Sequence, residues 1–241
     1  MASKKTIITT SWDDGHPLDL KLGKLLKENS IKGTFYTPIT NWANESLNLD
    51  EIEKLSNDFE IGGHTYNHAI LTLIPEQRMN LELLDSKTIL EKKTNREIIS
   101  FCYPLGQYND NIKKHVKDAG YLGARTSKIF KTSYSDSFEF HPTIHTTNRN
   151  FLSKGKGVLE NIGHSSSLVF KGKIFKHWSE IAKESLKHVL ENGGIWHLWG
   201  HSWEIEQNGD WEILADILNF VKQNGKNYGA EFLNNGDIFK K

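Results

Sequence analysis

Two carboxylates and two imidazoles are the side chains whose types and spacing could do chemistry together. The carboxylates are adjacent in residues 11–16 (SWDDGH), and the imidazoles are four positions apart in residues 61–68 (IGGHTYNH). Neighbours on an extended backbone point to opposite faces, so Asp13 and Asp14 should have different roles. His64 and His68 would share one face of a helical turn and could reach one metal ion. With Asp14 they would form a His2Asp site with open coordination positions, which is typical of catalytic rather than structural zinc.

Each of these patterns also has an ordinary explanation. Asp-Gly is a common turn dipeptide, and lone histidines are more often ordinary polar residues than ligands. No Glu follows His64, so the pair is not the metalloprotease helix motif. The functional interpretation therefore depends on both stretches occurring together.

Together they resemble the polysaccharide deacetylase family, the NodB-like domain of carbohydrate esterase family 4. That family has an Asp-Asp pair in its first motif and H-[ST]-x-x-H in its second. Its third motif, R-x-P-x-G, falls on residues 102–106 (CYPLG), and its last motif, a histidine near the final strands, falls on residues 196–203. The resemblance extends from about Thr6 to Phe220. It implies an incomplete or distorted (β/α) barrel and a metal-dependent deacetylase.

Removing an acetyl group requires a nucleophilic water, a stabilised oxyanion and a proton for the leaving group. A divalent ion held by Asp14, His64 and His68, with zinc as the first choice, would lower the pKa of its water and polarise the acyl oxygen. Asp13 would then be the general base.

The third motif is expected to form one wall of the substrate groove, through Tyr103 and Pro104. The resemblance implies that the backbone N–H of Leu105 is offered to the oxyanion. Pro104 itself has no N–H and cannot be that donor.

Cys102 stands where the family often has an arginine that orients the base. A thiol cannot hold a carboxylate ionised and aimed, so another cation should do so. Arg125 lies in a strand-like run that should end on the same face of the barrel. We expect its guanidinium to contact Asp13, directly or through one water, with Cys102 buried and inert beneath it.

Histidine can hold or release a proton near neutral pH, so it is the natural acid for the leaving group. His197 and His201 would share one face of a strand with Trp199. We favour His201, because residues 201–204 (HSWE) resemble the His-Pro-Trp-Glu form of several NodB-like deacetylases. His197 would lie deeper, as a packing or supporting residue.

Aromatic residues near these motifs could bind a sugar ring on their flat faces, although most tryptophans are simply core. The candidates are Trp199 and Trp203, with Trp12 close to the carboxylates. His16 is a further candidate for contact with substrate.

The order strand, loop, helix repeats along the chain, which predicts an α/β fold with parallel strands and functional residues at their carboxyl ends. The expected strands are residues 6–10, 35–36, 59–61, 98–101, 122–126 and 195–201, with a terminal strand or edge at 231–239. The expected helices are residues 18–28, 49–55, 77–93, 109–119, 178–191 and 211–223. Residues 128–176 are irregular and read as a barrel segment with long loops.

The 241 residues are expected to form one catalytic domain, residues 1–241. Thirty basic residues balance thirty acidic residues, so there is no electrostatic case for nucleic acid or a membrane surface as partner. The single cysteine excludes an intrachain disulfide. No apolar leader follows Met1, and no apolar run approaches the ~20 residues that span a bilayer. A cytoplasmic protein is expected, or a secreted one if a leader precedes this sequence.

An acetylated carbohydrate is the expected substrate, and removal of N- or O-acetyl groups is the expected reaction. A cytosolic amidohydrolase acting on a small N-acyl compound or ureide would keep the same fold, and the missing leader favours it. A catalytically silent carbohydrate-binding relative is the third possibility. The joint presence of Asp13, Asp14, His64, His68 and His201 argues against that third possibility.

Overall fold

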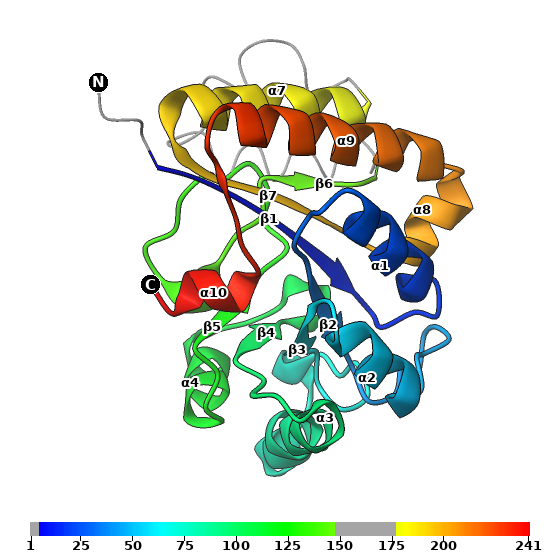
Figure 1. The fold of residues 1–241 in the computed structure, drawn as a ribbon. Helices are drawn as coiled ribbons and strands as arrows, with labels where there is room; N and C mark the ends of the chain where they lie inside the picture. Colours follow the sequence, from blue (N-terminus) through cyan, green and yellow to red (C-terminus); the bar gives the residue numbers. More distant parts are fainter. Residues whose placement is uncertain (1–4, 148–176) are drawn as a thin grey trace.

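Parallel β-strands form the centre of the computed structural model, which describes residues 5–147 and 177–241 (Figure 1). The strand order is β5-β4-β3-β2-β1-β7-β6, and β8 pairs with the amino-terminal part of β1. Every pair is parallel. The strands are β1 (Thr6–Asp13), β2 (Thr34–Thr37), β3 (Glu60–Gly63), β4 (Ser100–Cys102), β5 (Gly123–Arg125), β6 (Ile144–His145), β7 (Gly194–Gly200) and β8 (Glu231–Phe232).

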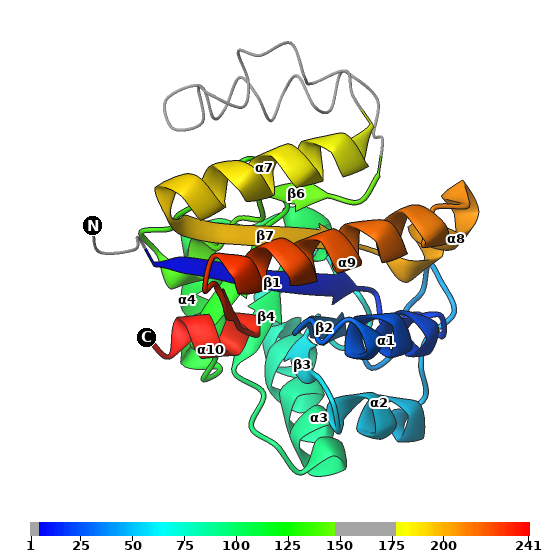
Figure 2. The same ribbon diagram turned by 45° about the horizontal axis from the view of Figure 1, so that its top comes forward.

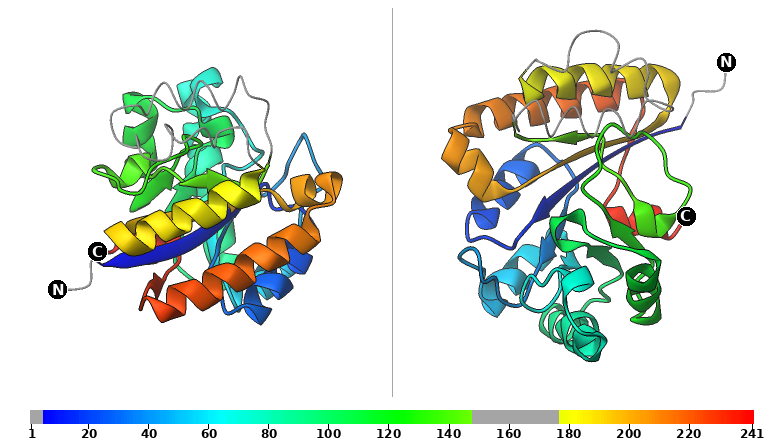
Figure 3. Two further views of the ribbon diagram at one scale, coloured as in Figure 1. Left: turned by 90° about the horizontal axis from the view of Figure 1, so that it is seen from above. Right: turned by 180° about the vertical axis from the view of Figure 1, so that it is seen from behind.

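Helices cover the outside of the curled sheet. They are α1 (Asp19–Glu28), α2 (Leu49–Ser56), α3 (Ser86–Thr94), α4 (Asp110–Asp118), α7 (Trp178–Asn192), α8 (Ser202–Asn208), α9 (Trp211–Asn227) and α10 (Asn235–Phe239). Helices α7 and α9 lie side by side along β1 and β7 (Figure 2), and the view from above shows the same arrangement (Figure 3). No helix within the described residues is both long enough and apolar enough to cross a membrane.

The sheet curls into a distorted barrel, as predicted, and irregular chain closes the gap between its two ends. Phe140 accepts a hydrogen bond from Thr126 and donates one to Ala124, so it adds to β5. A few residues later, Thr143 and Thr146 donate to carbonyls of β7. Residues 140–146 therefore connect the two ends of the sheet with little regular strand.

Strand β1 is buried along its whole length, and its two faces have different surroundings. Trp12 belongs to the main hydrophobic core beneath the helices. Ser11 and Asp13 face the barrel interior, where they contact His197 and Arg125 respectively. The period of two along a strand thus delivers polar side chains to the inside of the barrel.

The chain after β8 differs from the expected terminal strand. Only Glu231–Phe232 pairs with β1, and Asn235–Phe239 forms α10. Asn235 is fully buried, and its side chain bonds Thr9 and Tyr36 inside the barrel. A helical turn rather than a strand brings this amide into the interior.

Two other helical segments also differ from expectation. The segment predicted as one helix over residues 77–93 contains a π-helical turn, Leu81–Asp85, before α3. Helix α8 follows β7 directly and has no predicted counterpart. The expected irregular segment 128–176 lies outside the described residues from position 148 onward.

Candidate active site

The two adjacent carboxylates lie at the carboxyl end of β1 and line one cavity. Asp13 is the last residue of β1, whereas Asp14 begins a turn with a φ of 79°. His201 Nε2 lies 3.9 Å from Asp13 Oδ2 and 3.9 Å from Asp14 Oδ2. The expectation of opposite faces is therefore wrong, because the backbone leaves the extended conformation between the two residues.

His64 and His68 lie on a tight turn after β3 and not on the expected helical turn. Thr65 and His68 both have left-handed backbone, with φ values of 65° and 59°. This turn still brings the two imidazoles to the same carboxylate oxygen. His64 Nε2 is 3.6 Å and His68 Nε2 is 3.2 Å from Asp14 Oδ1.

These three side chains have the donor set and the orientation that a divalent cation requires. Their candidate ligand atoms lie within 4.8 Å of one another, and all three residues are buried. His64 Nδ1 lies 2.8 Å from the carbonyl oxygen of Cys102, so it is assigned as the N–H donor and leaves an Nε2 lone pair facing Asp14.

The second oxygen of Asp14 is already occupied. Asp14 Oδ2 accepts from Trp203 Nε1 at 2.9 Å and from Asn44 Nδ2 at 3.4 Å. Burial alone would raise the pKa of Asp14, but His64 and His68 hold that pKa well below its usual value. An ionised carboxylate with one oxygen directed at two imidazoles fits a metal ion.

Asp13 has a different partner, and it is the one expected from the sequence. Arg125 Nη2 donates to Asp13 Oδ2 and, at 2.7 Å, to Cys102 Sγ, while Nη1 donates to the carbonyl of Thr126. The predicted contact between Arg125 and Asp13 is confirmed. Burial would raise the pKa of Asp13, but the guanidinium outweighs burial and lowers it. Burial raises the pKa of the Cys102 thiol, which keeps it in the neutral form.

The pairing of β4 with β5 explains how Arg125 can reach Asp13 although position 102 is a cysteine. Cys102 at the end of β4 and Arg125 at the end of β5 are paired in register. The longer side chain therefore starts one strand further away and reaches across the small thiol to Asp13. Its guanidinium carbon also lies 4.5 Å from the centroid of the Trp199 ring, a favourable cation–π arrangement.

His201 follows β7 and is held by a carboxylate that the sequence analysis did not assign. His201 Nδ1 lies 2.7 Å from Glu204 Oε2, which is also 3.3 Å from His145 Nε2. Burial would lower the pKa of His201, but the bond to Glu204 raises it, so the protonated form is favoured. The HSWE sequence contained this signal, because residues three apart at the start of a helix share one face.

His197 is fully buried and lies deeper, as expected. Its Nε2 is 2.8 Å from Ser11 Oγ. Its ring stacks on the Phe140 ring, with 4.9 Å between the two ring centroids. Burial first, and then the charge of Arg125, hold its pKa well below the usual value. A neutral, packed imidazole cannot supply a proton to substrate.

The third motif contributes part of the cavity wall. Tyr103 and Leu105 line the cavity, whereas Pro104 is buried and outside the lining. Leu105 has a φ of 53° and its side chain is 62% exposed. Pro104 therefore does not contribute to the cavity surface as expected, and it begins the short 3-10 turn that carries Leu105.

Of the other residues expected to contact substrate, some line the cavity and some do not. Trp199 and Trp203 line the cavity. His16 is not among the lining residues, and its Nδ1 accepts from the Leu18 amide before α1. Trp12 is completely buried in the core. Trp12 is therefore not available to a ligand, whereas contact of the half-buried His16 with substrate stays a prediction.

The cavity has a volume of about 410 Å³, within the range of small-ligand sites. Four of its lining residues were not identified from the sequence: Trp42, Ala43, Asn44 and Ser127. All follow the carboxyl ends of β2 or β5. The rule that ligands bind at the carboxyl ends of parallel strands could have pointed to these loops.

Comparison with known proteins agrees with this geometry. The family model for polysaccharide deacetylase matches residues 1–124, which is more than half of the chain. The chain therefore belongs to the polysaccharide deacetylase family.

Individual relatives are more distant. Peptidoglycan-N-acetylglucosamine deacetylase of Bacillus cereus is 27% identical over 121 residues, which cover 49% of this chain and 55% of that protein. The chain spans about half the length of the curated relatives it matches.

Solved structures share the fold over nearly the whole chain. The chitin deacetylase of Colletotrichum lindemuthianum has a TM-score of 0.63 and 16% identity, covering 98% of this chain and 89% of that one. BA3943 of Bacillus anthracis, described as a CE4 family pseudoenzyme, has a TM-score of 0.57 and 13% identity. The match covers 98% of this chain and 66% of BA3943. The same fold thus occurs in an enzyme and in a pseudoenzyme, so the fold alone does not decide activity.

Proposed function

We propose that this protein is a metal-dependent hydrolase that removes N- or O-acetyl groups from an acetylated carbohydrate. One observation carries the proposal: Asp13, His201 and the Asp14, His64 and His68 cluster all line a single cavity. These are a base, an acid and a metal-binding group, which together meet the chemical demands of acyl hydrolysis.

Asp14, His64 and His68 would hold a divalent ion, with zinc as the first candidate. When bound, such an ion supplies Lewis acidity and lowers the pKa of a coordinated water. The Trp203 and Asn44 side chains hold the far oxygen of Asp14, which keeps the other oxygen aimed at the two imidazoles.

Asp13 would accept a proton from the attacking water, and Arg125 would keep this carboxylate ionised and correctly oriented. Leu105 lines the same cavity, and its backbone N–H would be the donor to the developing oxyanion. His201, held by Glu204, would deliver a proton to the leaving nitrogen or oxygen.

The silent carbohydrate-binding alternative is disfavoured because no member of the expected catalytic set is missing. The chain has both carboxylates, both histidine ligands and His201. A small N-acyl compound or ureide as substrate would use the same groups.

The test is hydrolysis of N-acetylglucosamine oligomers and acetylated xylan by purified protein, before and after removal of metal with a chelator. Acetate should be released, the chelator should abolish release, and added zinc should restore it. Asp14→Ala should lose both bound metal and activity. Acetate release that survives complete metal removal would overturn the metal requirement, and no release from any acetylated sugar would overturn the proposed substrate class.

A further inference from the structure

Glu82 is a completely buried glutamate that does not line the cavity and has no part in the proposed chemistry. It lies in the π-helical turn Leu81–Asp85 before α3, and its carboxylate contacts the turn that carries His64 and His68. A buried charge is costly unless several donors satisfy it. π-Helical turns are also frequent near functional sites.

The carboxylate accepts hydrogen bonds from two of the three residues between the histidines. Tyr66 N donates to Glu82 Oε2 at 3.0 Å, and Asn67 N donates to the same oxygen at 3.3 Å. The side-chain amide of Asn67, assigned with its nitrogen towards Glu82, donates to both carboxylate oxygens at 3.0 and 3.1 Å. Arg78 Nη2 lies 3.5 Å from Glu82 Oε1 and supplies a counter-charge. Hydrogen bonds from backbone amides to a carboxylate are charge-assisted and stronger than neutral ones.

The turn needs support from outside because its backbone is strained. Thr65 and His68 have φ values of 65° and 59°. Left-handed backbone is unfavourable for a β-branched residue such as threonine, so surrounding contacts must hold it. Trp42, in the loop after β2, holds the end of the turn, since its Nε1 donates to the carbonyl oxygen of His68 at 3.3 Å. Glu82 holds the middle of the turn.

The two imidazoles differ in how their rings are fixed. His64 Nδ1 lies 2.8 Å from the carbonyl oxygen of Cys102, which orients that ring directly. His68 Nδ1 is buried and has no hydrogen-bond partner among the described residues, although its Nε2 faces Asp14. The direction of the His68 ring therefore depends on packing and on where the turn places its backbone.

From these contacts we infer that Glu82 is a positioning residue for the candidate metal site. It fixes the middle of the turn and thereby sets how the His64 and His68 imidazoles face each other before an ion binds. This inference rests on the proposed function, because it concerns the same metal-binding group. Glu82 lies outside the cavity lining, so its loss should weaken metal binding through geometry rather than through a missing ligand.

The experiment measures the zinc affinity of metal-free protein by competition with a chromophoric chelator, so it does not depend on acetate release. Glu82→Met keeps about the same side-chain volume but leaves the amides of the turn without their acceptor. It should bind zinc about 10- to 100-fold more weakly, the usual cost of losing a residue that orients a metal ligand. Glu82→Gln keeps one acceptor oxygen and should recover most of the affinity. In cobalt-substituted protein, Glu82→Met should also change the visible absorption spectrum, which reports coordination geometry.

Glu91 of α3 provides the matched control. Its carboxylate also accepts from a backbone amide, that of Ile98 at 3.0 Å, and also pairs with a cation four residues earlier, Lys87. Ile98 precedes the amino end of β4, whereas the candidate metal site lies at the carboxyl ends of the strands. Glu91→Met should therefore lower the free energy of unfolding in urea without changing the zinc affinity or the cobalt spectrum.

If Glu82→Met binds zinc as tightly as wild-type protein, with the same cobalt spectrum, the positioning role is refuted and the proposed function stands. If Glu82→Met does not fold, Asn67→Ala provides the same test from the other side of the contact. It removes the side-chain hydrogen bonds from the partly exposed turn and leaves Glu82 in place. Its zinc affinity should fall about threefold, and an unchanged affinity would again refute the positioning role.

Activity and positioning can fail separately in this experiment. If wild-type protein binds zinc but releases no acetate, the proposed activity fails, while weaker zinc binding by Glu82→Met still supports the positioning role. Wild-type protein that binds neither zinc nor cobalt overturns both.

Discussion

Asp13 and Asp14 are neighbours in the chain but belong to different interaction networks. Asp13 meets a guanidinium, whereas Asp14 meets two imidazoles, an indole N–H and an amide. Both carboxylates are ionised, but for different reasons, and this difference separates the proposed base from the proposed metal ligand.

Replacing Asp13 by Asn tests that division of labour. The amide keeps the shape of the side chain but cannot accept the proton, so turnover should fall by roughly 10²-fold or more. Bound metal, measured by elemental analysis, should stay close to the wild-type amount because Asp14 is intact. Loss of metal from Asp13→Asn would mean that the two roles are reversed.

Arg125→Met should lower turnover and also destabilise the protein. The change leaves the buried Asp13 carboxylate without its cation, and breaking a buried pair in this way costs about 3–5 kcal/mol. Metal content of the folded fraction should be unchanged, since Arg125 binds no metal ligand.

The double variant Asp13→Asn/Arg125→Met isolates the cause. The double variant also removes the unpaired buried charge of Asp13. Urea unfolding should therefore show that the double variant is more stable than Arg125→Met alone. Equal stability of the single and double variants would contradict the buried-charge explanation, and unchanged turnover of Arg125→Met would refute its role in orienting the base.

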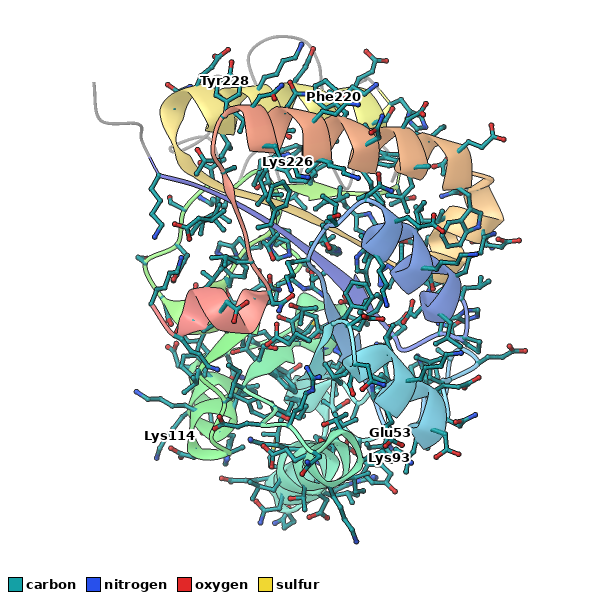
Figure 4. The ribbon with its side chains drawn as sticks, viewed as in Figure 1. Glu53, Lys93, Lys114, Phe220, Lys226 and Tyr228 are labelled. Atoms are coloured by element: carbon teal, nitrogen blue, oxygen red, sulfur yellow. The ribbon has the colours of Figure 1, made fainter. Side chains whose placement is uncertain are left out.

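At the level of elements, α2 and α3 show which local interactions stabilise the fold. The Asn48 side chain caps α2 by accepting hydrogen bonds from the backbone amides of Asp50 and Glu51. In return, the Glu51 carboxylate accepts a hydrogen bond from the backbone amide of Asn48. Lys93 of α3 also pairs with Glu53 of α2 at 2.8 Å, and the two labelled side chains lie together on the surface (Figure 4). The cap satisfies backbone groups that would otherwise lack partners, while the ion pair is exposed to water and salt.

Asn48→Ala should therefore cost about 1 kcal/mol of unfolding free energy. Lys93→Met should cost less, about 0.5 kcal/mol, because exposed ion pairs contribute little. Urea unfolding at low and high salt measures both losses of unfolding free energy. Only the loss caused by Lys93→Met should depend on the salt concentration. A larger loss for Lys93→Met would show that the pairing of α2 with α3 matters more than the cap.

For the whole molecule, the irregular chain near Phe140 joins the two ends of the sheet, and we expect His141 to make the stability of this region depend on pH. His141 Nδ1 contacts the Thr126 hydroxyl beside β5 at 2.5 Å. Burial first, and then the charges of Lys128 and Lys131, lower the pKa of His141 from 6.5 to about 4. Folding thus favours the neutral imidazole, so its contribution to stability is present above about pH 6.5 and is lost as pH falls towards about 4.

The unfolding free energy should consequently fall between about pH 7 and about pH 5, and His141→Gln should remove part of that fall. Glutamine keeps a polar side chain and cannot be protonated in this range. Chemical unfolding of both proteins at the two pH values provides the measurement. An identical decline in the two proteins would exclude His141 as a cause.

Local sequence determined strands β1 to β5 and β7, most helices and the positions of the candidate metal ligands. Apolar runs ending in turn residues predict buried strands, and Asp13, Asp14, His64 and His68 stand where two of those strands end. Because parallel strands place their carboxyl ends at one edge, that pattern was sufficient to bring these residues together.

Tertiary structure decided which residues complete the site. The pairing of Cys102 with Arg125 in register lets the guanidinium reach Asp13, and the docking of the Trp42 loop depends on hydrogen bonds to Asp14 and His68. Such contacts join residues far apart in the chain and depend on strand register and loop conformation, which no local pattern specifies. The left-handed conformation at Asp14 is permitted by its Asp-Gly sequence, but the strand pattern that placed the two carboxylates did not indicate it.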